Sequence, residues 1–252
     1  MQPYFFPYLG HFCLIACVDR WFVLDITQYT PQTWMNRNRI LHPYAGWQYI
    51  TVPLSKSSSS MKICEAKILD VSAAKELIAR KLTHYKKHAP YYRSVVALVH
   101  EAFDTTTDHS LVQLNVRGLQ AVCRYLGIRF DFQVCSELNL PLPTSLRPGD
   151  WAPNICSLVG ATSYVNPVGG QELFDPDEFS RRGVDLYFAK TKAFSYDPSP
   201  YTYEPDLSIL DVLMWNSPTT VGDAIRQCVE LVQADTSRRG AIVDLRQPNL
   251  KS

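Results

Sequence analysis

The stretch LVQLNVRGLQAVCRYLGIRFDFQV at residues 111–134 decides the predicted fold, because a helix pattern in it is followed at once by a strand pattern. From Leu111 to Leu126 the apolar residues recur at intervals of three and four, which predicts a helix with one buried face. Gly127 is the residue type that most often follows a helix end. The segment from Ile128 to Val134 predicts a strand. The apolar positions of the helix are Val112, Val116, Leu119, Cys123 and Leu126.

The same alternation continues toward the C-terminus. Short helix patterns and short strand patterns follow each other as far as residue 190, which is typical of a largely parallel sheet covered by helices. We therefore expect an α/β fold with a mostly parallel sheet flanked by helices. The apolar segments 207–215 and 221–232 close the fold. The expected helices span 150–159 and 176–182, and the expected strands span 162–166 and 184–190.

Before residue 111, strand and helix patterns are grouped differently. Residues 21–26 and 49–53 are apolar and predict strands, and residues 62–69 alternate loosely and predict an edge strand. Residues 72–85 and 92–103 predict two helices separated by a proline. Because no repeat and no long linker interrupts the chain, we expect a single composite domain over 1–252, with residues 236–252 as a peripheral tail.

Bulk composition excludes several classes of protein. The 25 Lys and Arg nearly balance the 24 Asp and Glu, so we expect neither a nucleic acid nor a membrane as partner. The longest apolar run near the N-terminus, 12–18, is far shorter than the ~20 residues of a membrane span. The seven cysteines form no CxxC pair, which indicates reduced thiols in a cytoplasmic protein.

The N-terminal stretch MQPYFFPYLGHFCLI, residues 1–15, contains five aromatic residues and must be packed into the domain to avoid a large exposed apolar patch. His11 lies inside it and is a candidate general base, although a buried, satisfied histidine is the more common case. Cys13 and Cys17 are candidate nucleophiles beside His11. Inert, buried thiols are the alternative for both.

Two polar motifs follow. Asp25 ends an apolar strand, where α/β proteins often place ligand-binding side chains, and Gln28 follows closely; a turn or capping role is equally consistent with the spacing. The run Asn36-Arg37-Asn38-Arg39 suits recognition of carboxylate, phosphate or sugar groups, with a solvated or ion-paired surface as the alternative. If the backbone is extended, the asparagines and the arginines face opposite sides, so one pair at most lines a site.

A glycine pair follows the strand predicted at 162–166. Gly169 and Gly170 lie where backbone N–H groups can bind an anion, and a simple glycine turn is the alternative. His84 and His88 are four residues apart but have no evident third ligand, so no metal site is predicted. The nucleotide, P-loop and hydrolase motifs GxGxxG, Walker A, HExxH and GxSxG do not occur, and no cofactor is predicted.

Four blocks together resemble the WbqC-like family of bacterial proteins. They are QPYFFPYLG at 2–10, the run 25–41 that ends in WMNRNRIL, SYVNPVGGQEL at 163–173, and PDLSILDVLMWNSP at 205–218. The resemblance implies a tailoring role in O-antigen, other surface-polysaccharide or nonribosomal-peptide biosynthesis. The chain departs from the pattern at Ile26, where relatives often have a second aspartate, and at His11, where they often have tyrosine.

From these features we expect acyl or aminoacyl transfer, or thioester processing, on a small-molecule substrate or one bound to a peptidyl or acyl carrier protein. In this hypothesis His11 deprotonates an attacking amine or activates a cysteine, Asp25 joins it, and an arginine orients an anionic group. The alternative is a non-catalytic module that binds a carrier protein or a sugar nucleotide; a cysteine hydrolase is a third option. The expected catalytic residues are His11, Asp25, Cys13 and Cys17, and the expected substrate-binding residues are Gln2, Tyr4, Tyr8, Gln28, Trp34, Asn36, Arg37, Asn38, Arg39, Gly169 and Gly170.

Overall fold

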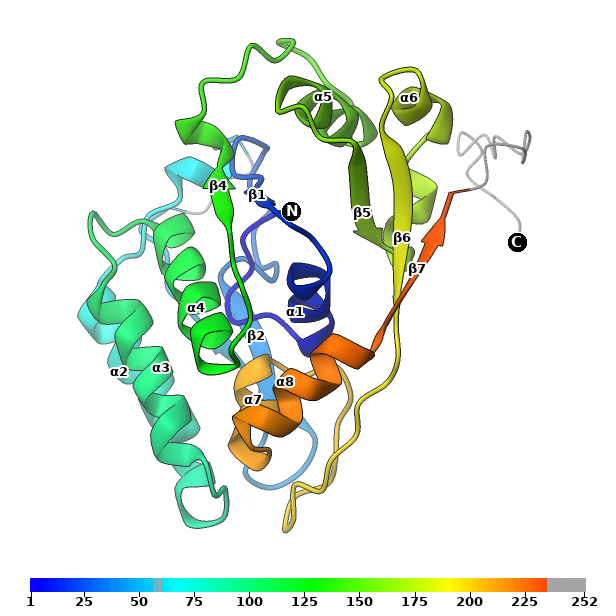
Figure 1. Ribbon diagram of the computed structural model, residues 1–252. Coiled ribbons are helices and arrows are strands. Elements are labelled where there is room, and N and C mark those ends of the chain that lie inside the picture. Colours follow the sequence, from blue (N-terminus) through cyan, green and yellow to red (C-terminus); the bar gives the residue numbers. More distant parts are fainter. Residues whose placement is uncertain (57, 59, 235–252) are drawn as a thin grey trace, which may run out of the picture. The chain divides into compact units, whose positions relative to one another are not determined.

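The computed structural model describes residues 1–56, 58 and 60–234 (Figure 1). The tail predicted at 236–252 lies outside these residues. The chain forms two compact units: unit 1 comprises Met1–Pro141 and Lys190–Glu230, and unit 2 comprises Leu142–Ala189 and continues from Leu231. The single composite domain expected over 1–252 stays a prediction.

Three helices of unit 1 lie side by side in Figure 1: α2 (Val71–Leu82), α3 (Tyr92–Asp104) and α4 (Leu111–Tyr125). The helix predicted from the 111–134 stretch is confirmed as α4. It begins at Ser110, whose hydroxyl accepts from Gln113 N (3.2 Å), and it is followed by Gly127 at φ +64°. A second group consists of α1 (Leu9–Ala16), α7 (Ile209–Trp215) and α8 (Pro218–Gln227), in which α8 contacts both others.

The strands of unit 1 form two separate pairs. β1 (Trp21–Val23) lies parallel to β4 (Phe132–Val134), whereas β2 (Arg37–Leu41) and β3 (Trp47–Thr51) form an antiparallel hairpin. The strand predicted at 62–69 is wrong. A 3₁₀ turn, η1 (Ile63–Glu65), replaces it, because the Glu65 carboxylate accepts from Lys62 N (2.7 Å) and closes the turn.

Unit 2 contains a small sheet in which β5 (Ser163–Pro167) and β6 (Asp185–Thr191) are parallel, and β7 (Val229–Gln233) pairs with the other edge of β6. The helices α5 (Trp151–Leu158) and α6 (Pro176–Ser180) contribute to its core around the buried Phe179. The remaining 3₁₀ turns are η2 (Thr83–Lys87), η3 (Cys135–Glu137), η4 (Pro148–Asp150) and η5 (Val168–Leu173).

Helices and strands therefore alternate as predicted, which is an α/β arrangement, but a mostly parallel sheet is not confirmed. The strands fall into three small sheets, one of them an antiparallel pair. The segment predicted at 221–232 also divides, because α8 ends at Gln227 and β7 begins at Val229. Within residues 1–56, 58 and 60–234, no helix is both long enough and apolar enough to cross a membrane.

Candidate functional site

The N-terminal segment is packed into unit 1, and buried amides hold its backbone. Phe5 and Phe6 are at most 1% exposed, and Phe6 has a φ of +37°, a conformation that a bulky side chain rarely adopts. The amide of Asn38 donates to the carbonyls of Phe5 (3.0 Å) and Phe6 (2.9 Å), and the hydroxyl of Ser208 donates to Phe6 O (2.7 Å). These bonds hold the strained turn in place.

Two further asparagines have the same kind of role. Asn115 of α4 donates to the carbonyls of Pro3 (2.9 Å) and Met35 (2.8 Å). Asn36 accepts from the Tyr29 hydroxyl (3.2 Å) and donates to Val52 O (3.1 Å). Asn36 and Asn38 therefore lie on the inner side of the hairpin and hold backbone groups there, and their expected substrate-binding role stays a prediction.

His11 is enclosed by aromatic rings. It is 1% exposed, with ring centroids 4.9 Å from Trp21 and 5.6 Å from Tyr4. Burial lowers the pKa of His11 to about 3, so the imidazole is neutral near pH 7, and its Nε2 has no hydrogen-bond partner among the described residues. A base with this pKa accepts a proton poorly, so burial does not favour the catalytic role expected for His11, and that role stays a prediction.

The two candidate cysteine nucleophiles are not paired with this histidine. Cys13 is two residues from His11 on α1, a spacing that places side chains on different helix faces. Burial raises the pKa of Cys13, and so does a hydrogen bond with Cys228. The thiol of Cys17 donates to Leu14 O (3.2 Å), and burial raises its pKa too. Burial therefore favours the protonated form of both thiols, and their expected nucleophilic role stays a prediction.

Asp25 is buried and fixed by one neighbour. Its carboxylate accepts from the backbone N (2.9 Å) and the hydroxyl (2.5 Å) of Ser136. Gln28 is exposed and forms a β-bridge with Lys62, while Gln2 donates weakly to Thr27 Oγ1 (3.5 Å). The Tyr4 hydroxyl in turn donates to Gln2 Oε1 (3.5 Å). These residues join the 25–28 loop to the N-terminal segment.

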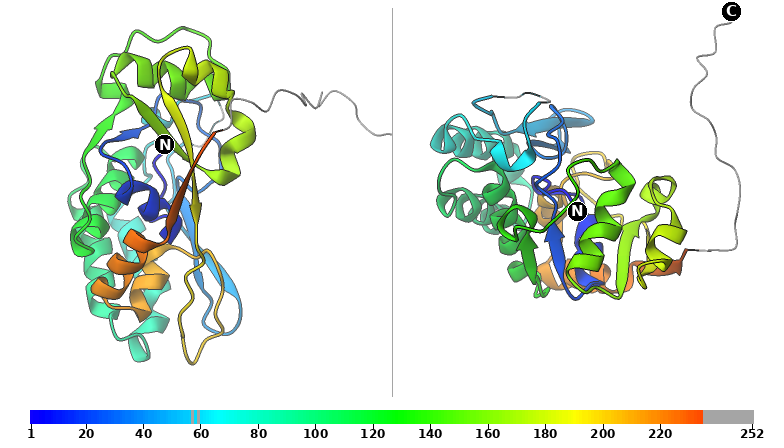
Figure 2. Two further views of the ribbon diagram at one scale, coloured as in Figure 1. Left: turned by 45° about the vertical axis from the view of Figure 1, so that its right-hand side comes forward. Right: turned by 90° about the horizontal axis from the view of Figure 1, so that it is seen from above.

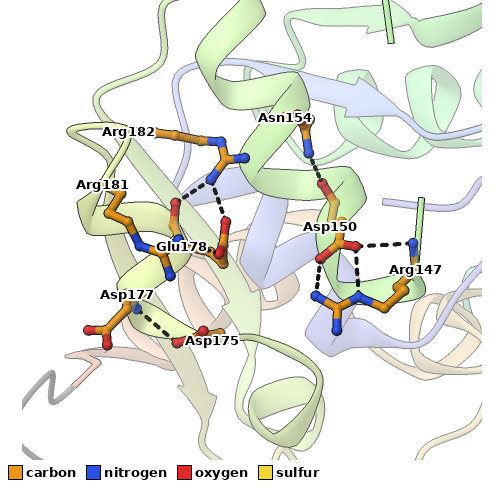
Figure 3. Close-up of polar contacts among 8 residues, drawn as sticks. All are labelled: Arg147, Asp150, Asn154, Asp175, Asp177, Glu178, Arg181 and Arg182. Atoms are coloured by element: carbon orange, nitrogen blue, oxygen red, sulfur yellow. Dashed lines mark hydrogen bonds and ion pairs between the residues drawn. The ribbon is translucent and has the colours of Figure 1, made fainter. Parts of the chain in front are cut away.

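Gly169 and Gly170 belong to η5 in unit 2. A Cβ on Gly170 would lie 2.5 Å from Asn166 Oδ1, so close packing explains the absence of a side chain there. The described arginines of unit 2, up to residue 234, are ion-paired, and Figure 3 shows Arg147 on Asp150 and Arg182 on Glu178. The structure therefore gives a packing reason for Gly170 but none for Gly169, where a Cβ would meet nothing within 4 Å, and the anion-binding role of the pair stays a prediction.

A cavity of about 260 Å³ lies entirely within unit 1, between the start of α1 and the loop 191–207; we name it the Tyr8 cavity. The ring of Tyr8 folds over Gly10, where a Cβ would lie 2.5 Å from a ring carbon. Burial and the charge of Asp206 raise the pKa of Tyr8, so its hydroxyl stays protonated, and no described residue hydrogen-bonds to it. The charged and phenolic residues of the lining are Tyr8, Lys192, Tyr196, Tyr203, Glu204 and Asp206.

A buried carboxylate supports one wall of the Tyr8 cavity. Asp211 of α7 accepts from the hydroxyl of Tyr196 (2.7 Å), from the hydroxyl of Tyr85, and from Leu41 N (3.0 Å). Burial raises the pKa of Asp211 despite these hydrogen bonds. This network was not predicted from the sequence. The signal for it was the aspartate inside the apolar run ILDVLMW at 209–215, because a carboxylate in a buried helix needs hydrogen-bond donors.

Arg37, Arg39 and Trp34 lie on the outer side of the hairpin. Arg37 and Arg39 are half-buried, Asn36 and Asn38 are buried, and the strand pairing confirms an extended backbone, so the predicted separation of the two pairs is confirmed. Arg39 is also close to the Tyr8 cavity, because its guanidinium donates to Asp206 O (3.2 Å). Of the expected site residues, Tyr8 lines the cavity, and Arg39 adjoins it through its bond to the backbone of Asp206.

Comparison with known proteins places these features in a family. The sequence profile described as "WbqC-like protein family" matches residues 2–222. A Mycobacterium tuberculosis (strain ATCC 25618 / H37Rv) protein named "Uncharacterized protein Rv1507c" is 30% identical over 230 residues, which cover 90% of this chain and 96% of that protein. No solved structure matches this chain.

Proposed function

The chain belongs to the WbqC-like protein family, and from that premise we propose that it is a bacterial tailoring enzyme of surface-polysaccharide or natural-product biosynthesis. It transfers an acyl or aminoacyl group, or processes a thioester, in the Tyr8 cavity. The observation that carries the proposal is the protonated Tyr8 hydroxyl, which has no hydrogen-bond partner among the described residues, near the charge of Asp206 in a cavity of about 260 Å³. All seven cysteines are unpaired, which supports a cytoplasmic location.

The charges of the cavity suit an amine-containing substrate. Glu204 and Asp206 contribute two carboxylates and Lys192 contributes one cation, so an ammonium group is attracted by the carboxylates. The volume of the Tyr8 cavity is somewhat below the ~300 Å³ at which sites for drug-sized ligands begin. This size suits a small group such as an amino acid. Asp211 fixes the Tyr196 hydroxyl, so this ring is a rigid wall of the cavity.

The proposed reaction uses two of these groups. The bound ammonium first loses one proton to solvent, and the neutral amine nitrogen then bonds to the thioester carbonyl carbon while the carbon–sulfur bond breaks. Asp206 takes the proton of the amine and passes it to the departing thiolate, so that charge and atoms balance. Tyr8 donates a hydrogen bond to the carbonyl oxygen as negative charge develops there. Neither His11 nor the cysteines have a part in this scheme.

Removing the Tyr8 hydroxyl tests the proposal. Aminoacyl thioesters and aminoacyl-loaded carrier proteins are incubated with the protein, and product is followed by mass spectrometry. Tyr8→Phe should lower the transfer rate by about 100-fold, as loss of one oxyanion donor typically does. Tyr44→Phe is the matched control, because Tyr44 is 91% exposed and should not affect the rate.

Two outcomes would contradict the proposal. Equal rates for Tyr8→Phe and the wild-type protein would remove Tyr8 from the chemistry. Binding of the thioester with no product over a wide range of concentrations would instead support the non-catalytic module that binds a carrier protein for a partner enzyme.

A further inference from the structure

The outer side of the β2–β3 hairpin carries two arginines on three aromatic rings; we name this surface the arginine–aromatic face. Arg37 lies over Tyr49, with its Cζ 4.2 Å from the ring centroid. Arg39 lies over two indoles, at 5.4 Å from Trp34 and 5.2 Å from Trp47. Both indoles remain 41% exposed.

These arginines pack on aromatic rings and, unlike the arginines of α5, α6 and their flanking turns, have no carboxylate partner among the described residues. Within residues 1–56, 58 and 60–234, neither guanidinium of the arginine–aromatic face is in an ion pair, whereas Arg147, Arg181 and Arg182 of unit 2 all are (Figure 3). Arg39 uses one N–H on Asp206 O, and its buried Nε has no partner in the described chain. A buried N–H without an acceptor lowers the stability of the folded protein. A hydrogen-bond acceptor bound at this guanidinium would remove that cost.

Cation–π contacts alone do not account for this arrangement. They stabilise an exposed site by only about 0.5–1 kcal/mol each. Two large indoles that stay partly exposed around one guanidinium form a joint apolar surface, which is typical of an interaction site. A planar guanidinium with free N–H groups matches the oxygens of a phosphate, and the neighbouring indoles restrict water around it.

The position of Arg39 links this face to the Tyr8 cavity. Arg39 holds the carbonyl of Asp206, and Asp206 and Tyr8 both line the cavity. Figure 2 shows the hairpin and the loop 192–207 running beside each other, in agreement with the bond from Ser208 N to Arg39 O (2.8 Å). One ligand can therefore have its reactive end in the cavity and an anionic group on Arg39.

We propose that the arginine–aromatic face binds the phosphate group of the acyl donor. This inference rests on the proposed function, since it names the donor as a phosphate-bearing thioester of the phosphopantetheine type. The same chemistry is present in a free coenzyme thioester and in a carrier-protein arm. Arg39 is the principal phosphate ligand, and Arg37 adds to the attraction from the same strand.

A matched pair of ligands tests the inference. Binding of phosphopantetheine and of pantetheine, which lacks the phosphate, is measured by isothermal titration calorimetry and by tryptophan fluorescence. The wild-type protein should bind the phosphorylated compound about tenfold more tightly, as one charge-assisted hydrogen-bond pair predicts. Arg39→Gln should abolish the difference, and Arg39→Lys should restore it only in part because lysine lacks the planar fork.

Two controls guard against misfolding. Arg129→Gln removes an exposed, ion-paired arginine of the same unit and should leave the tenfold preference intact. Arg37→Gln should reduce the preference without abolishing it, and thermal unfolding checks that each variant is folded. Equal binding of the two compounds by the wild-type protein, absence of binding by both, or an unchanged preference in Arg39→Gln overturns the inference.

Turnover separates this inference from the proposed function. Transfer from pantetheine and phosphopantetheine thioesters with the same KM would contradict the phosphate site while supporting the enzyme. A phosphate preference in binding that disappears in Arg39→Gln, with no product from any thioester, would support the phosphate site and contradict the enzyme. Comparing the coenzyme thioester with the acyl carrier protein then identifies the source of the phosphate.

Discussion

The two sides of strand β2 use neighbouring residues for different purposes. On the inner side Asn38 is 3% exposed and satisfies the carbonyls of Phe5 and Phe6. On the outer side Arg39 packs on exposed indoles and keeps its Nε without a partner in the described chain. The comparison teaches that a polar motif of four residues can divide by strand alternation into a structural half and a half that is free to bind a ligand.

The largest expected effect comes from breaking the inner side. Asn38→Ala leaves the buried Phe5 carbonyl without its donor, whereas the Phe6 carbonyl keeps the hydroxyl of Ser208. The variant should lower the free energy of unfolding by about 2–4 kcal/mol, at 1–3 kcal/mol for the unsatisfied Phe5 carbonyl with the rest from the lost contacts. Arg39→Gln, one residue along, should cost less than about 1 kcal/mol. Urea unfolding measures both. Similar losses of unfolding free energy in the two variants would show that the inner and outer sides of β2 contribute equally to stability, which would contradict the comparison.

A second expected effect concerns acid stability. His11 has a pKa of about 3 in the folded protein and about 6.5 when unfolded, so between these values only the unfolded chain binds the extra proton. As pH falls through this window, the free energy of unfolding should decrease by about 1.4 kcal/mol per pH unit from this group alone. His11→Phe should remove that contribution, and urea titrations between pH 7 and 4 measure the difference.

The same variant examines the role of the N-terminal segment. Near pH 7, His11→Phe should change stability by less than about 1.5 kcal/mol, because a ring of similar size replaces a neutral imidazole whose Nε2 has no partner in the described chain. Activity should be retained. An inactive but stable His11→Phe protein would return His11 to the catalytic residues.

How much was predictable depends on whether the decisive contacts were local. The periodic stretch at 111–126 predicted α4 correctly, because its apolar residues recur at helical intervals and so indicate the buried face directly. The alternation from Asn36 to Arg39 predicted that the asparagines and the arginines lie on opposite sides of the strand. It did not predict which pair holds buried backbone groups, because the partners of Asn38 are Phe5 and Phe6, more than thirty positions away. The Asp211 network was missed for the same reason, because its partners Tyr85 and Leu41 come from remote segments.

A smaller effect is expected where Tyr8 covers α1. In Gly10→Ala the new Cβ would lie 2.5 Å from the Tyr8 ring, so the ring must move, at a cost of about 1 kcal/mol or more. In a Tyr8→Ala background the same substitution should instead stabilise by up to about 1 kcal/mol, because alanine favours the helix more than glycine does. A double-mutant cycle measures this change of sign. Destabilisation of equal size in both backgrounds would mean that Tyr8 does not occupy the space over Gly10.

The smallest expected effect returns to the outer side of β2. Arg37 and Tyr49 should show a coupling free energy of only about 0.5–1 kcal/mol in a double-mutant cycle of Arg37→Gln with Tyr49→Leu, measured by urea unfolding. A small value is what the comparison requires, because a surface that contributes little to folding is available to bind a ligand without loss of stability. A coupling above about 2 kcal/mol would instead make the arginine–aromatic face a second structural element. In that case both sides of β2 would stabilise the fold, and the outer side would no longer differ from the inner side as the proposed phosphate site requires.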